Sequence, residues 1–113
     1  MMTKVPTATV IITNPTHYAV ALKYVAGETA APICVAKGVD RVALKIREVA
    51  TEASVPIIEN VALARAIFAT VDLDETIPAE HYQAVAKIIG VILGVAAKRK
   101  SGNSPENRAR LAA

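Results

Sequence analysis

Four consecutive residues near the N-terminus, Asn14, Pro15, Thr16 and His17, have the types and spacing needed to break the chain. In deamidation, the backbone nitrogen of the next residue attacks the asparagine side chain. Proline has no N–H, so that route is closed at Asn14. The remaining route is attack by the Asn14 side-chain amide nitrogen on its own main-chain carbonyl, which forms a succinimide and expels the Pro15 nitrogen. The tertiary amide before proline has weaker geometric preferences than an ordinary peptide, and a tight turn can twist it further.

This attack also needs a base for the amide nitrogen and a hydrogen-bond donor for the developing oxyanion. If Asn14 begins a β-turn, Pro15 takes the second position and His17 the fourth, which brings the outer Cα atoms within about 7 Å. The His17 imidazole can orient Asn14 or move a proton. Thr16 can offer a hydroxyl or a backbone donor. The alternative interpretation is an ordinary turn, because Asn-Pro is a common turn dipeptide.

The segments that flank this motif are predicted to be strands. Residues 8–13 are short, apolar and β-branched, which is typical of a buried strand, and residues 18–24 resume the pattern. We expect further strands at residues 33–36 and 56–59, and helices at 39–53, 62–70 and 78–97. The order β-β-β-α-β-α-α predicts an α/β (α+β) fold, in which a small central sheet of about four strands is flanked by helices.

Composition narrows the class of protein. The chain has 113 residues, of which 53% are hydrophobic, so it can form one domain and is too apolar to be disordered. Cys34 is the single cysteine, so no disulfide can form within the chain, and its apolar surroundings predict a buried, inert thiol. The longest apolar stretch, residues 88–97, has about half the roughly 20 residues that cross a bilayer. No signal peptide is recognised. We therefore expect a soluble, intracellular domain or a fragment of a larger protein.

The net charge of +3 is unevenly distributed. Residues 1–97 carry eight basic and nine acidic side chains, whereas residues 98–113 carry five basic side chains and Glu106 alone. The basicity therefore belongs to residues 98–113, which we interpret as a disordered, solubilising tail. The rest of the chain lacks RNA-binding aromatic motifs and zinc-finger spacing, so no nucleic-acid partner is expected.

Other candidate ligands are isolated. His81 has no partner at metal-ligand spacing, and we interpret it as a surface histidine. Asp72, Asp74 and Glu75 lack the glycine and the closing glutamate of a calcium loop. No glycine-rich phosphate loop accompanies Gly38. The sequence therefore predicts neither a metal site nor a cofactor.

The wider sequence resembles the cytoplasmic domain of the FlhB/YscU family, the export-switch proteins of type III secretion systems. The motif N-P-T-H is flanked by VIIT and YAVALKY and followed by APICVAKG, VDRVALKIREVA, VPIIEN, LARAIFATV and IPAEHYQAVAKIIG. The resemblance covers about residues 3–100 in order. The segments AVALKY and VALKIRE are closer to the flagellar branch than to the virulence (injectisome) branch.

The resemblance implies a self-cleaving domain on the cytoplasmic side of the bacterial inner membrane. Family members cut themselves between the asparagine and proline of the motif, here Asn14 and Pro15, and the pieces stay together. Residues 1–7 would be the end of a linker from an N-terminal membrane domain, and 8–97 the autocleaving domain. The cut Asn14 would be consumed once, so the domain would not be a turnover enzyme.

The same resemblance implies partners. These are other export-gate membrane proteins, a secreted length-control protein and early export substrates of the rod-and-hook type, before secretion switches to filament-type substrates. The site proposed for early substrates matches Ala31, Pro32, Ala86 and Ile89 here. The alternative for the two helix residues, Ala86 and Ile89, is that they are ordinary core residues. A non-cleaving docking module is the alternative for the domain as a whole.

Overall fold

The computed structural model describes residues 1–15 and 17–101, with side chains as far as residue 94. Its strands form one mixed four-stranded sheet in the order β3-β2-β1-β4. The strands are β1 (Val10–Asn14), β2 (Tyr18–Lys23), β3 (Ile33–Val39) and β4 (Ile57–Glu59), and the helices are α1 (Asp40–Glu52), α2 (Val61–Thr70) and α3 (Tyr82–Ser101). Short 3-10 helices, η1 (Met2–Thr7) and η2 (Ala79–His81), precede β1 and α3. The predicted fold class and element order are confirmed.

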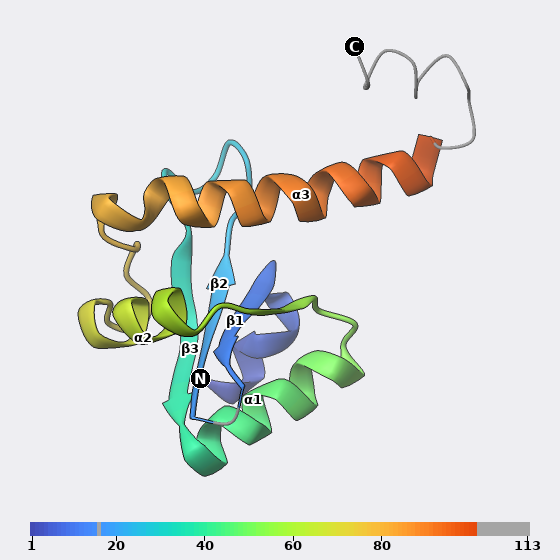
Figure 1. Ribbon diagram of the computed structural model, residues 1–113. Coiled ribbons are helices and arrows are strands. Elements are labelled where there is room, and N and C mark those ends of the chain that lie inside the picture. The colour runs from blue at the N-terminus through green and yellow to red at the C-terminus, as the bar shows by residue number, and fades with distance from the viewer. Residues whose placement is uncertain (16, 102–113) are drawn as a thin grey trace.

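The strand β1 lies inside the sheet, antiparallel to β2 and parallel to β4. Its side chains alternate between two separate cores. Val10 and Ile12 face one core with α2 and α3, whereas Ile11 faces the other with α1 and η1. Both faces of β1 are therefore covered, which explains why its sequence is a continuous apolar run. Figure 1 shows α1 and α3 at opposite ends of the sheet.

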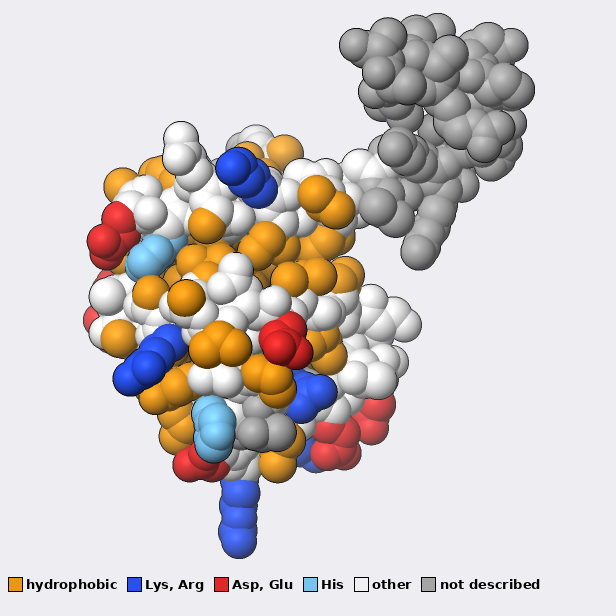
Figure 2. All heavy atoms as spheres, in the orientation of Figure 1, with side chains coloured by type: hydrophobic (Ala, Val, Ile, Leu, Met, Phe, Trp, Pro, Cys, Tyr) orange, Lys and Arg blue, Asp and Glu red, His pale blue; other side chains and the backbone are white. Residues whose placement is uncertain are grey.

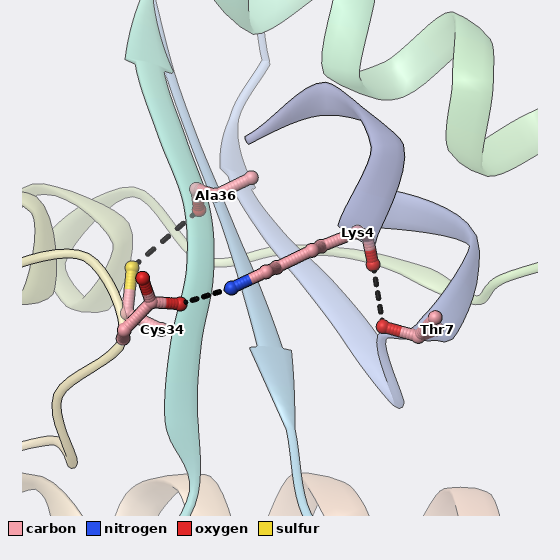
Figure 3. A network of polar contacts seen from close by, with 5 residues as sticks. Lys4, Thr7, Cys34 and Ala36 are labelled. Carbon is pink, nitrogen blue, oxygen red and sulfur yellow. Dashed lines mark hydrogen bonds and ion pairs between the residues drawn. The ribbon is translucent and has the colours of Figure 1, made fainter.

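The first seven residues are more closely packed than an extended linker. Residues 2–7 form η1, and Val5 is completely buried in the core shared with α1 and β3. The Lys4 ammonium forms a 2.7 Å ion pair with Asp74, while Thr7 donates to the Lys4 carbonyl oxygen (Figure 3). The interpretation of residues 1–7 as the end of a linker remains a prediction. From residue 102 onwards, the predicted tail lies outside the residues that the structure describes.

The strand β3 extends to Val39, three residues past its predicted end. The extension carries Lys37 into a half-buried position, where its ammonium donates to the carbonyl oxygens of Phe68 and Val71 at 3.2 and 2.7 Å. The same ammonium lies 5.0 Å from the centre of the Phe68 ring. These contacts satisfy the free carbonyls at the C-terminal end of α2. A lysine can therefore continue the strand because another element supplies its acceptors.

Candidate functional site

The Asn-Pro turn (residues 14–17) connects β1 to β2. Asn14 is the last residue of β1 and pairs with Tyr18, the first residue of β2. The backbone N–H of His17 donates to the carbonyl oxygen of Asn14 at 2.7 Å, which closes the four-residue turn expected from the sequence. That carbonyl belongs to the Asn14–Pro15 bond. The donor therefore lies where an oxyanion would form if the bond were attacked. Thr16 is outside the described residues.

The turn is also attached to α1. The backbone N–H of Asp40 donates to the His17 carbonyl oxygen at 2.9 Å, and the Arg47 guanidinium donates through Nη1 to the Pro15 carbonyl oxygen at 2.7 Å. The Asp40 carboxylate lies 3.6 Å from Nδ1 of His17. Both side chains are mostly exposed, so this ion pair contributes little to stability but can orient the imidazole ring.

An open pocket of about 540 Å³ lies beside this turn. It is lined by Asn14, His17, Tyr18, Val39, Asp40 and Arg65. Asn14 and His17 were predicted from the sequence, whereas Asp40, Arg47 and Arg65 were not. No local pattern in the sequence indicates the contacts of Asp40 and Arg47 with the turn, because the residues that form them are far apart in the chain.

The second predicted site lies at the other end of β2. A groove of about 340 Å³, here called the α3 groove, contains all four predicted residues, Ala31, Pro32, Ala86 and Ile89. It is completed by Tyr24, Ala30, Tyr82, Gly90 and Leu93. Ala86 is exposed, whereas Ala31 and Ile89 are each only 5% exposed. Figure 2 shows hydrophobic side chains gathered along α3 on the face in view.

The structure gives different outcomes for the predictions made for Cys34 and His81. Cys34 is buried, which confirms that part of its prediction, and burial raises the pKa of its thiol to about 11, which disfavours the reactive thiolate. Its Sγ contacts the carbonyl oxygen of Ala36 (Figure 3). The prediction of a surface histidine at position 81 was wrong, because that side chain is only 13% exposed. Among the described residues, no cluster of three potential ligands could hold a metal ion.

Comparison with known proteins assigns the class. A model described as the "FlhB HrpN YscU SpaS Family" matches residues 1–92, and the chain belongs to this family.

Its relatives include flagellar biosynthetic protein FlhB of Bacillus subtilis, which is 51% identical over 81% of this chain and 26% of its own length. FlhB of Salmonella typhimurium is 42% identical over 95% of this chain and 29% of its own length. The chain thus spans about a quarter of the length of these relatives.

Solved structures agree with this assignment. The crystal structure of the cytoplasmic domain of FlhB from Shewanella putrefaciens is 49% identical, has a TM-score of 0.78, and matches 81% of this chain and 76% of that one. A mutated EscU C-terminal domain has the same TM-score at 32% identity, and matches 80% of this chain and 91% of that one. No helix in the described part of the chain is long and apolar enough to span a membrane.

Proposed function

We propose that this domain cuts its own chain between Asn14 and Pro15. The side-chain amide nitrogen of Asn14 gives up a proton and attacks the main-chain carbonyl carbon of the same residue. The bond from that carbon to the Pro15 nitrogen then breaks, and the nitrogen takes up a proton. The products are a C-terminal succinimide on residues 1–14, which water can later open, and a secondary amine at Pro15. The observation that carries the proposal is the 2.7 Å hydrogen bond from the His17 N–H to the carbonyl oxygen under attack.

The roles within the turn follow from its geometry. The His17 N–H is already aimed at the oxygen on which negative charge develops, so it needs no rearrangement during the reaction. The His17 imidazole lines the same pocket as Asn14 and can accept the amide proton. Asp40, 3.6 Å from Nδ1, stabilises the protonated ring. Thr16 keeps its expected role as a hydroxyl or backbone donor, which is also part of the proposal.

The two pieces are expected to remain together after the cut. The N-terminal piece ends with β1, which pairs with β2 through five residues and with β4 through three. Val5, Val10, Ile11 and Ile12 of this piece are completely buried. Separating the pieces would expose both cores to water, whereas breaking one bond in the turn leaves the sheet paired.

The biological role we propose is that of an export switch. The family assignment and the flagellar relatives support a domain tethered on the cytoplasmic side of the bacterial inner membrane, within the type III export apparatus. There it would help change secretion from rod-and-hook-type to filament-type substrates, with other export-gate proteins and a secreted length-control protein as partners. The α3 groove would bind early substrates. An injectisome homologue is the second candidate, favoured by the likeness to the EscU C-terminal domain.

The deciding experiment is the denatured intact mass of freshly made protein. Cleavage predicts two species, residues 1–14 and 15–113, instead of one of 11.9 kDa. Asn14→Ala removes the nucleophile and should abolish the cut while leaving the circular dichroism spectrum unchanged.

Asn60→Ala is the matched control. It removes the side chain that caps α2 by accepting from the Leu63 N–H at 3.1 Å, so it costs about 1 kcal/mol of stability without touching the turn. It should still cleave. A single uncut species from the unaltered chain would leave the non-cleaving docking module as the function.

A further inference from the structure

Arg47 is the one described side chain outside the turn with a hydrogen bond to the turn's backbone. It lies in the second half of α1, and its neighbour Ile46 is completely buried, which fixes this part of the helix against the sheet. Its guanidinium is within ion-pair distance of no carboxylate among residues 1–15 and 17–101. The charge of Arg47 is therefore directed at a backbone carbonyl oxygen, that of Pro15.

The position of that oxygen matters for the cleavage reaction. The pyrrolidine ring fixes the φ angle of Pro15, so ψ is its only soft backbone angle. A hydrogen bond to the Pro15 carbonyl oxygen fixes ψ and removes this remaining freedom. Pro15 carries the leaving nitrogen. The Arg47 bond therefore holds the leaving side of the Asn14–Pro15 bond, while the His17 N–H holds the carbonyl side.

The attachment to α1 has two points. Asp40 holds the His17 carbonyl oxygen at the start of the helix, and Arg47 holds the Pro15 carbonyl oxygen two helical turns later, about 10 Å along the axis. The turn is thus held to α1 through the carbonyl oxygens of two of its residues, Pro15 and His17. Intramolecular attack is sensitive to such positioning, since a misplacement of about 1 Å can cost a hundredfold in rate.

We propose that Arg47 is a positioning residue for self-cleavage, acting through the carbonyl oxygen of Pro15. It touches none of the atoms whose bonds change. This inference rests on the proposed cleavage at Asn14–Pro15 and adds a residue from a different element to the machinery. Replacing the guanidinium frees the Pro15 backbone and slows the attack, even when the sheet and both cores remain folded.

The test follows cleavage from synthesis, by translating the whole 113-residue chain in a cell-free system and quenching samples in denaturant. Arg47→Met keeps the apolar stem and should slow the first-order cleavage at least tenfold, which corresponds to about 1.4 kcal/mol of activation free energy. Arg47→Lys retains a donor and should give an intermediate rate. Arg41→Met is the matched control, because it removes the same charge from an exposed position on the same helix and should cleave within twofold of the unaltered rate.

Chemical rescue separates positioning from a merely structural role. Added guanidinium ion at non-denaturing concentration should speed cleavage of Arg47→Ala and leave Arg41→Ala unchanged. Thermal unfolding of Asn14→Ala with and without Arg47→Met shows whether the variant is folded. If Arg47→Met and Arg47→Lys both cleave at the unaltered rate, the inference is overturned and the proposed function stands. An uncut unaltered chain would overturn the proposed function, and this inference with it.

Discussion

The Asn-Pro turn and the α3 groove lie at the two ends of β2, six residues or about 20 Å apart, and they are built from different interactions. The turn is held by directional hydrogen bonds from the backbone N–H groups of His17 and Asp40 and from the Arg47 guanidinium to three backbone carbonyl oxygens. The groove is lined mainly by apolar side chains from α3 and the β2–β3 loop. Directional bonds fix a single geometry, which suits a reaction, whereas apolar contacts tolerate several shapes of bound segment.

The turn and the groove also differ in how substitutions affect the stability of the domain. At the turn, His17 and Asp40 are exposed and Asn14 and Arg47 are half-buried, and none of the four belongs to either hydrophobic core. At the groove, a lining residue such as Ile89 also belongs to the core beneath α2 and α3. Function and stability are therefore separable at the turn and partly shared at the groove, and substitutions at each end can test this contrast.

The largest effect is expected at the groove. Ile89→Ala should lower the free energy of unfolding by about 3 kcal/mol, because it leaves a cavity in the core. Ala86→Asp changes an exposed residue of the same groove and should cost less than about 1 kcal/mol. Urea denaturation in the Asn14→Ala background measures both.

In the corresponding full-length protein, Ala86→Asp should reduce secretion of rod-and-hook-type substrates while leaving cleavage unchanged. Equal losses of stability from the two substitutions would show that the groove is simply part of the core. Normal secretion with Ala86→Asp would remove early substrates from the groove.

The next effect concerns the His17 side chain. His17→Ala removes the imidazole but keeps the backbone N–H that bonds to the Asn14 carbonyl oxygen. It should therefore slow cleavage by about a hundredfold rather than stop it. Asp40→Asn, which removes only the charge beside Nδ1, should have a smaller effect in the same direction. Both rates come from the cell-free assay, and an unaltered rate for His17→Ala would take the imidazole out of the mechanism.

The smallest effect compares two glycines. A Cβ on Gly38, at the end of β3, would overlap Cγ1 of Val42 and lie 2.6 Å from its Cβ. Valine is stiff at χ1, so Gly38→Ala should destabilise the fold by about 1–3 kcal/mol. Gly94 in α3 has open space around it, and Gly94→Ala should instead stabilise the helix by up to about 1 kcal/mol. Thermal unfolding distinguishes the two, and opposite signs are required.

Elements that follow from local sequence patterns could be predicted, whereas contacts between distant residues could not. The apolar run of β1 and the helical spacing in α1 follow from local patterns, so the element order could be predicted. The turn was predictable because Asn14 and His17 are three residues apart. Arg47 and Pro15 are 32 residues apart, and no local pattern indicates which charged residue of α1 reaches the turn. The same holds for Lys37, whose acceptors in and just after α2 allow β3 to continue.

His81 shows that the burial of a side chain is also hard to predict from the sequence. A histidine beside Glu80 and Tyr82 at the start of a helix has the local composition of a surface position. In the structure its side chain is nevertheless only 13% exposed, at the end of the 3-10 helix η2 that precedes α3. Burial of a single polar residue depends on the path of the chain, which residue types alone do not specify.

The placement of β1 in the interior of the sheet has a mechanical consequence. In the uncut chain, a pull on Met1 reaches the rest of the domain through the covalent bond at the turn and through the ladders to β2 and β4. After a cut, only non-covalent contacts carry that load: the ladders, which are loaded in shear, the buried side chains of the N-terminal piece, and the Lys4–Asp74 ion pair. The cut domain would thus become a junction of finite strength, able to transmit tension up to a threshold and to part above it.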